Sequence, residues 1–79
     1  MKKMEDILIG NRIKNIRISL EMDQKDFSNL IGSKVSALSN WENGRNKPNM
    51  EKLTKIANIG NTTVEELLYG NYYRYFFNS

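Results

Sequence analysis

The residue types that most often perform catalysis or bind metals are missing from this chain, which contains no cysteine and no histidine. Their absence excludes thiol nucleophiles, thiolate zinc sites and the commonest general base. Carboxylates can also act in pairs, and two pairs are close in sequence: Asp23 with Asp26, and Glu65 with Glu66. Helix caps and a solvated helix face account for both pairs. We therefore expect no catalytic residue, no metal site, no cofactor and no small-molecule ligand, and an enzyme is the least favoured class of function.

The charge of the chain favours a polyanionic partner. Twelve Lys and Arg residues stand against nine Asp and Glu, for a formal net charge of +3. A local excess of basic residues suits nucleic acid. Most of this excess lies in one segment, residues 34–55, where five basic residues face two acidic ones: Lys34, Arg45, Lys47, Lys52 and Lys55 against Glu42 and Glu51.

The length of 79 residues leaves room for one small domain. No apolar run approaches the roughly 18 residues that a membrane span needs. The start of the chain also lacks the hydrophobic stretch of a secretory signal peptide. We expect a cytoplasmic protein that makes no contact with a membrane.

Apolar residues recur at helical spacing and predict five helices, which make an all-α compact bundle over residues 1–69. The helices are expected at about 6–20, 23–31 and 34–43, between Pro48 and Gly60, and from Thr62 or Thr63 to about 69. No strand pattern appears in this region. The predicted inward-facing residues are Ile9, Ile13, Ile16, Leu20, Phe27, Leu30, Ile31, Leu38, Trp41, Met50, Leu53, Ile56, Ala57, Val64, Leu67 and Leu68.

Residues with known preferences for helix ends mark the boundaries. Asp23 is a good N-cap for the second helix, and Gly32 can adopt the left-handed conformation that ends it. Ser33 is the expected cap of the third helix, which Gly44 closes.

Residues 24–43 thus form two short helices joined by a glycine turn, which is the pattern of a helix-turn-helix. The pattern needs a small residue in the first helix, a glycine in the turn and apolar residues at fixed later positions. Over about residues 9–69 the sequence resembles the lambda-repressor-like family, the Cro and phage-repressor regulators. The stretches that carry this resemblance are Asp23-Gln24, Ser28, Leu30-Ile31-Gly32, Leu38-Ser39-Asn40-Trp41-Glu42-Asn43-Gly44, Lys47-Pro48 and Val64-Glu65-Glu66-Leu67-Leu68.

The resemblance implies that helix 34–43 lies in the major groove of DNA and that its early residues touch base edges. Asn40 can pair with adenine through two hydrogen bonds, Lys34 can donate to guanine, and Val35 can touch a thymine methyl group. The alternative is that the polar residues merely solvate an amphipathic helix. The base-reading surface predicted in this way consists of Lys34, Val35, Ser36, Ser39 and Asn40.

The resemblance also implies contacts with the DNA backbone. Gln24 matches the family position at which a side chain and a nearby amide meet a phosphate, although a helix start alone would explain such a residue. The loop after the reading helix resembles the backbone-clamping turn of the family, and any connector could have a similar composition. The loop residues expected at phosphates are Asn43, Arg45, Asn46 and Lys47.

Two matched positions imply structural roles instead. Arg17 and Glu42 match a family arginine and glutamate that form an ion pair, and Trp41 is expected in the core rather than stacked on a base. Glu21 departs from the family, where glycine is common, so this turn either avoids the left-handed conformation or carries a cost. Ser33 and Lys34 also differ from the residue types that are common at the matching family positions. The N-cap of the reading helix, and with it the position of Val35, can therefore be shifted by one residue.

The tail, residues 70–79, is unlike the rest of the chain because five of its ten residues are aromatic. Aromatic side chains at this density need a cover in water. We favour dimerisation through the tail, and the alternatives are a lid over the chain's own helices and a fragment cut at the linker of a longer regulator. The candidate dimerisation residues are Tyr72, Tyr73, Tyr75, Phe76 and Phe77.

Together these features predict a sequence-specific regulator of transcription that binds double-stranded DNA. We expect a repressor that acts as a homodimer on a palindromic operator, because occupancy of a promoter is enough for repression. The alternative is a protein-interaction module or antitoxin component that contacts another protein through the aromatic tail.

Overall fold

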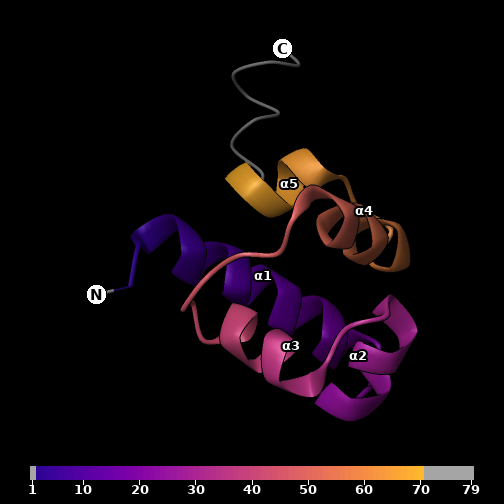
Figure 1. Ribbon diagram of the computed structural model, residues 1–79. Coiled ribbons are helices and arrows are strands. Elements are labelled where there is room, and N and C mark those ends of the chain that lie inside the picture. Colours follow the sequence, from indigo (N-terminus) through magenta and orange to yellow (C-terminus); the bar gives the residue numbers. More distant parts are fainter. Residues whose placement is uncertain (1, 71–79) are drawn as a thin grey trace.

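Five helices follow one another along the chain in the computed structural model, which describes residues 2–70 (Figure 1). No strand occurs in this part of the chain, so the prediction of an all-α fold is confirmed. The five candidate dimerisation residues of the tail lie outside the described residues. The helices are α1 (Met4–Ser19), α2 (Gln24–Ile31), α3 (Val35–Glu42), α4 (Met50–Ile59) and α5 (Val64–Tyr69).

Helix α1 is the centre of the packing, with α3 and α5 both against it (Figure 1). Helix α2 packs on α3 and α4, and α4 packs on α5. The apolar sides of all five helices meet in one core, and burying such surface is the main force that drives folding. Its buried members are Ile9, Ile13, Phe27, Ile31, Leu38, Trp41, Leu53, Ile56, Ala57 and Leu67.

Three residues predicted to face inward are instead exposed. Leu20 is 41% exposed because α1 ends one residue before it. Met50 is 60% exposed at the first position of α4, one turn before the buried part of that helix. Leu30 is 52% exposed because Phe27 and Ile31, four residues apart, already occupy the inward stripe of α2. Helical spacing alone could not choose among neighbouring apolar residues in so short a helix.

The turn between α2 and α3 forms as predicted, but α3 begins later than expected. The carboxylate of Asp23 accepts a hydrogen bond from the backbone N–H of Asp26 at 2.8 Å, and Gly32 is left-handed with φ of 72°. Lys34, not Ser33, is the N-cap of α3, and it caps through its backbone without a side-chain hydrogen bond. The prediction of Ser33 as the cap is wrong, because its hydroxyl donates to the Lys34 carbonyl oxygen instead.

The turn between α1 and α2 places Glu21 in the left-handed region, with φ of 57°. The backbone N–H of Met22 donates to the carbonyl oxygen of Arg17 at 3.2 Å, which closes the turn. The chain therefore keeps a left-handed turn here without a glycine. None of the described helices is long and apolar enough to cross a membrane.

Candidate nucleic-acid interface

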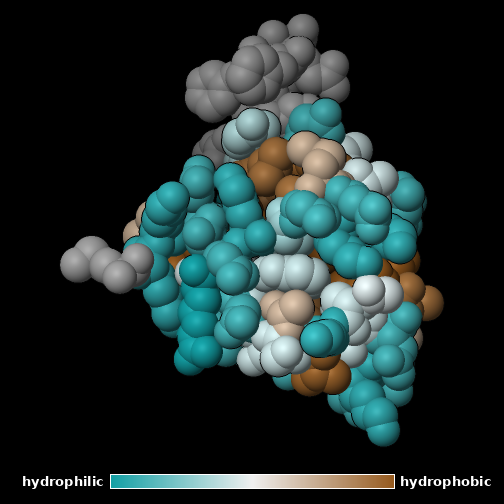
Figure 2. All heavy atoms as spheres, in the orientation of Figure 1, coloured by the Kyte–Doolittle hydropathy of each residue, from teal (hydrophilic) through white to brown (hydrophobic). Residues whose placement is uncertain are grey.

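Helix α3 has one buried side and one side open to solvent. Leu38 and Trp41 pack into the core, so Trp41 is a core residue as predicted. The face of the molecule on which α3 lies carries mostly hydrophilic and weakly polar side chains (Figure 2). Of the five predicted base-reading residues, Lys34, Val35 and Ser36 are exposed, whereas Ser39 and Asn40 are half-buried.

The loop after α3 contacts Ser39 and Asn40, which were expected on the exposed reading surface. The amide nitrogen of Asn43 donates to Ser39 Oγ at 3.4 Å, and Arg45 Nη1 donates to Asn40 Oδ1 at 3.2 Å. Gly44 makes this return possible because its φ is 74°, a conformation that other residues rarely adopt. Asn43 and Arg45, which are predicted to contact the DNA backbone, therefore contact two predicted base-reading residues.

The same loop then runs along the amino-terminal end of α1. Asn46 and Lys47 are exposed, and Pro48 is buried. The Nζ of Lys47 lies 3.6 Å from Glu5 Oε1, a contact between two largely exposed side chains. The four loop residues that are predicted to contact phosphates are all exposed to solvent: Asn43, Arg45, Asn46 and Lys47.

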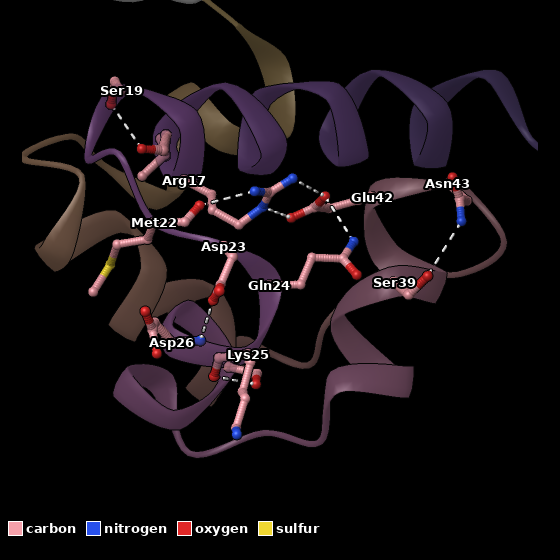
Figure 3. Close-up of polar contacts among 12 residues, drawn as sticks. Arg17, Ser19, Met22, Asp23, Gln24, Lys25, Asp26, Ser39, Glu42 and Asn43 are labelled. Atoms are coloured by element: carbon pink, nitrogen blue, oxygen red, sulfur yellow. Dashed lines mark hydrogen bonds and ion pairs between the residues drawn. The ribbon is translucent and has the colours of Figure 1, made fainter.

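Arg17 and Glu42 form a two-point ion pair between α1 and the last residue of α3 (Figure 3). Arg17 Nε donates to Glu42 Oε2 at 2.7 Å, and Nη2 donates to Oε1 at 3.0 Å. Arg17 Nη1 also donates to the carbonyl oxygen of Met22 at 2.9 Å. The hydrogen bonds that Arg17 donates to Glu42 raise the pKa of Arg17. The pair fixes the end of α3 against α1 and the turn that leads into α2.

Gln24 joins this pair from the first residue of α2 (Figure 3). Its amide nitrogen donates to Glu42 Oε1 at 3.1 Å, and the side chain is half-buried. Three helices therefore meet at one carboxylate. Sequence reasoning missed this contact, and no local signal could have revealed it because Gln24 and Glu42 are 18 positions apart.

Not every basic residue of the segment 34–55 is available to a partner. Lys52 Nζ donates to the carbonyl oxygens of Ile31 and Gly32 at 3.1 and 2.8 Å, and so caps the carboxyl end of α2. This structural role was missed, although a lysine is a natural partner for a helix carboxyl end. Exposed basic side chains of the segment are those of Lys34, Arg45, Lys47 and Lys55.

Sequence comparison finds similarity to helix-turn-helix proteins. The Helix-turn-helix family model, HTH_3, matches residues 13–67. The chain is 30% identical over 61 residues to the HTH-type transcriptional activator BcrR of Enterococcus faecalis. That alignment covers 77% of this chain and 30% of BcrR, so the chain spans about a third of the length of this relative.

Solved structures with the same fold include the P22 c2 repressor in complex with the synthetic operator 9T. Its TM-score is 0.77 at 30% identity, over 81% of this chain and 97% of that chain. The DNA-binding domain of the same repressor in solution has a TM-score of 0.73, also at 30% identity, over 81% of this chain and 84% of that chain. The controller protein C.AhdI of Aeromonas hydrophila has a TM-score of 0.73 at 20% identity, over 82% of this chain and 98% of that one, and shows the fold alone.

Proposed function

Because the chain belongs to the helix-turn-helix family HTH_3 of DNA-binding transcription regulators, we propose that it binds a specific duplex sequence with α3 in the major groove. One observation carries the proposal. The outer side of α3 is exposed at its amino-terminal end and half-buried where the loop contacts Ser39 and Asn40, while its inner side is fixed by the core and by the Arg17–Glu42 ion pair. A rigid helix with a solvated outer face is what base reading requires.

We assign the two kinds of contact to different parts of the surface. Base edges are read from α3 and its N-cap, and phosphates are bound by the loop and by the start of α2. Gln24 takes part in phosphate binding through the N-terminus of α2, where it is the first residue, since its side-chain amide nitrogen is held by Glu42. The base-reading residues are Lys34, Val35, Ser36, Ser39 and Asn40, and the backbone residues are Gln24, Asn43, Arg45, Asn46 and Lys47.

The proposed functional unit is a homodimer on a palindromic operator with half-sites about 34 Å apart. The aromatic tail supports this part of the proposal, and Tyr69, which is 59% exposed at the end of α5, adjoins it. Sedimentation of the protein with its duplex measures the stoichiometry. Two chains per palindrome are expected, and one chain at saturation would contradict the dimer.

Selection of bound sequences from a randomised duplex pool tests the proposed DNA binding. Enrichment of a short site with two-fold symmetry is expected. Affinity for that site should fall steeply with salt, by about 0.9 in log K per unit of log salt concentration for each phosphate contacted. A protein-interaction module would enrich no site.

We propose repression as the regulatory effect, because occupying a promoter requires no further contact surface. The similar proteins carry both kinds of name, an activator in BcrR and a repressor in P22 c2. A reporter gene with the selected site overlapping its promoter separates the two effects. Repression lowers expression when the chain is supplied, and an increase would identify an activator.

A further inference from the structure

We propose that Arg45 sets the base preference of Asn40 by holding its side-chain amide in one orientation. This inference rests on the proposed function, in which α3 lies in the major groove. Arg45 Nη1 donates to the side chain of Asn40 at 3.2 Å. Arginine has only donors, so the amide atom that faces it is the oxygen, Oδ1. The amide nitrogen of Asn40, with two donors, is therefore left for a base.

The backbone holds Arg45 in this place. Its backbone N–H donates to the carbonyl oxygen of Asn40 at 3.0 Å, and the N–H of Gly44 donates to the carbonyl oxygen of Trp41 at 3.1 Å. Both the main chain and the side chain of Arg45 are thus attached to Asn40. Arg45 has five N–H donors, and the remaining ones can bind a phosphate at the same time.

The orientation changes which base Asn40 fits. An asparagine that binds adenine with two hydrogen bonds needs its oxygen for the N6 amino group and its nitrogen for N7. Here the oxygen already accepts from a cation, and a base amino group would have to share it. Guanine presents two acceptors in the major groove, N7 and O6, and needs only the amide donors. The held amide therefore favours guanine over adenine, in place of the adenine contact expected from the residue type alone.

Binding constants for four duplexes that differ at one base pair test this inference. The pair to vary is the one at which Asn40→Ala abolishes discrimination. The wild-type chain should prefer guanine there by about tenfold, the size of a good base contact. Arg45→Ala should weaken all four duplexes and move the preference to adenine, because the free amide can then use both its atoms.

Lys47→Ala is the matched control. It removes the same charge from the same loop, but Lys47 Nζ faces Glu5 and not Asn40. It should weaken the four duplexes by one common factor. Arg45→Lys keeps the charge without the planar fork, and should retain most of the affinity while reducing the preference for guanine. Circular dichroism melting of each variant shows whether the fold is retained.

Three results would overturn the inference. The first is a loss in Arg45→Ala that is equal for all four duplexes, as for Lys47→Ala, since Arg45 would then contact only phosphates. The second is a wild-type preference for adenine, and the third is Asn40→Ala binding with unchanged discrimination at every base pair. Failure of the wild-type chain to bind any duplex is a different outcome, which contradicts the proposed function from which the inference follows.

Discussion

The carbonyl oxygen of Trp41 lies so close to Gly10 that a Cβ atom added there would overlap it. The carbonyl of Glu42 is next, with its oxygen 3.1 Å from the same position. Helix α1 and helix α3 therefore touch backbone to backbone at this point. The position of α3, and with it the proposed DNA-reading surface, depends on the absence of one side chain.

Gly10→Ala should destabilise the protein for this reason. Alanine favours a helix by up to about 1 kcal/mol over glycine, but overpacking against backbone costs about 1–3 kcal/mol. A lower melting temperature is expected by circular dichroism. Asn15→Ala, at an exposed position of the same helix, is the control and should leave stability within about 0.5 kcal/mol. A rise in melting temperature for Gly10→Ala would show that α3 can move away at little cost.

Glu42→Ala should be strongly destabilising, by about 3 kcal/mol, because it leaves the largely buried guanidinium of Arg17 without its carboxylate. The side chains of the pair are only 13% and 3% exposed. Urea denaturation measures the loss. Glu51→Gln is the control, since Glu51 pairs with Lys52 at 3.8 Å from a 71% exposed side chain and should matter by less than about 0.5 kcal/mol. Equal losses in the two variants would contradict a structural role for the Arg17–Glu42 pair.

The raised pKa of Arg17 also fixes the sign of a pH effect. A group whose pKa is higher in the folded state stabilises the protein at every pH below its unfolded pKa, and loses this contribution only as pH rises through the folded value. For Arg17 this contribution is lost only in strong alkali. The deprotonation of Arg17 should therefore cause no change in stability across the neutral range, as denaturation at several pH values for wild type and Arg17→Lys would show.

Glu21→Gly should stabilise the protein by about 0.5–1 kcal/mol. Glu21 has φ of 57°, where a side chain carries a steric cost that glycine avoids, and this relief outweighs the greater freedom of glycine in the unfolded chain. Thermal denaturation measures the gain. Glu21→Ala removes the same carboxylate but keeps the Cβ, so it separates backbone strain from loss of charge. A similar gain in both variants would assign the effect to the charge.

Glu5→Gln should strengthen DNA binding at low salt by a few fold. Glu5 lies 3.6 Å from the Nζ of Lys47 and competes with a phosphate for it. The gain should fade as salt screens the carboxylate. Glu65→Gln changes the net charge equally but lies in the first turn of α5, and Glu65 forms no ion pair with Lys47 in the described structure. Binding isotherms that improve equally for both variants would mean that total charge, rather than the contact with Lys47, is responsible.

Much of the fold could be predicted from local sequence because its signals are local. Asp23 caps α2, Gly32 ends it, and the apolar spacing of Phe27 and Ile31 orients it, each within one or two turns of helix. The helix-turn-helix followed from such signals together with the resemblance to known regulators. The same reasoning was wrong for Leu20, Leu30 and Met50, because the edge of a core is set by neighbouring helices.

The candidate site, like the fold, was predictable only in part from local sequence. Residue type, charge and position on a helix can be read from the chain alone, and they were enough to predict which residues are candidates for DNA reading. How these residues are held depends on the packing of the helices. The tertiary structure attached Gln24 to Glu42, committed Lys52 to the end of α2, and turned the loop so that Arg45 faces Asn40. These contacts join residues on different elements, and short hydrogen bonds depend on a folded geometry that no spacing along the chain encodes.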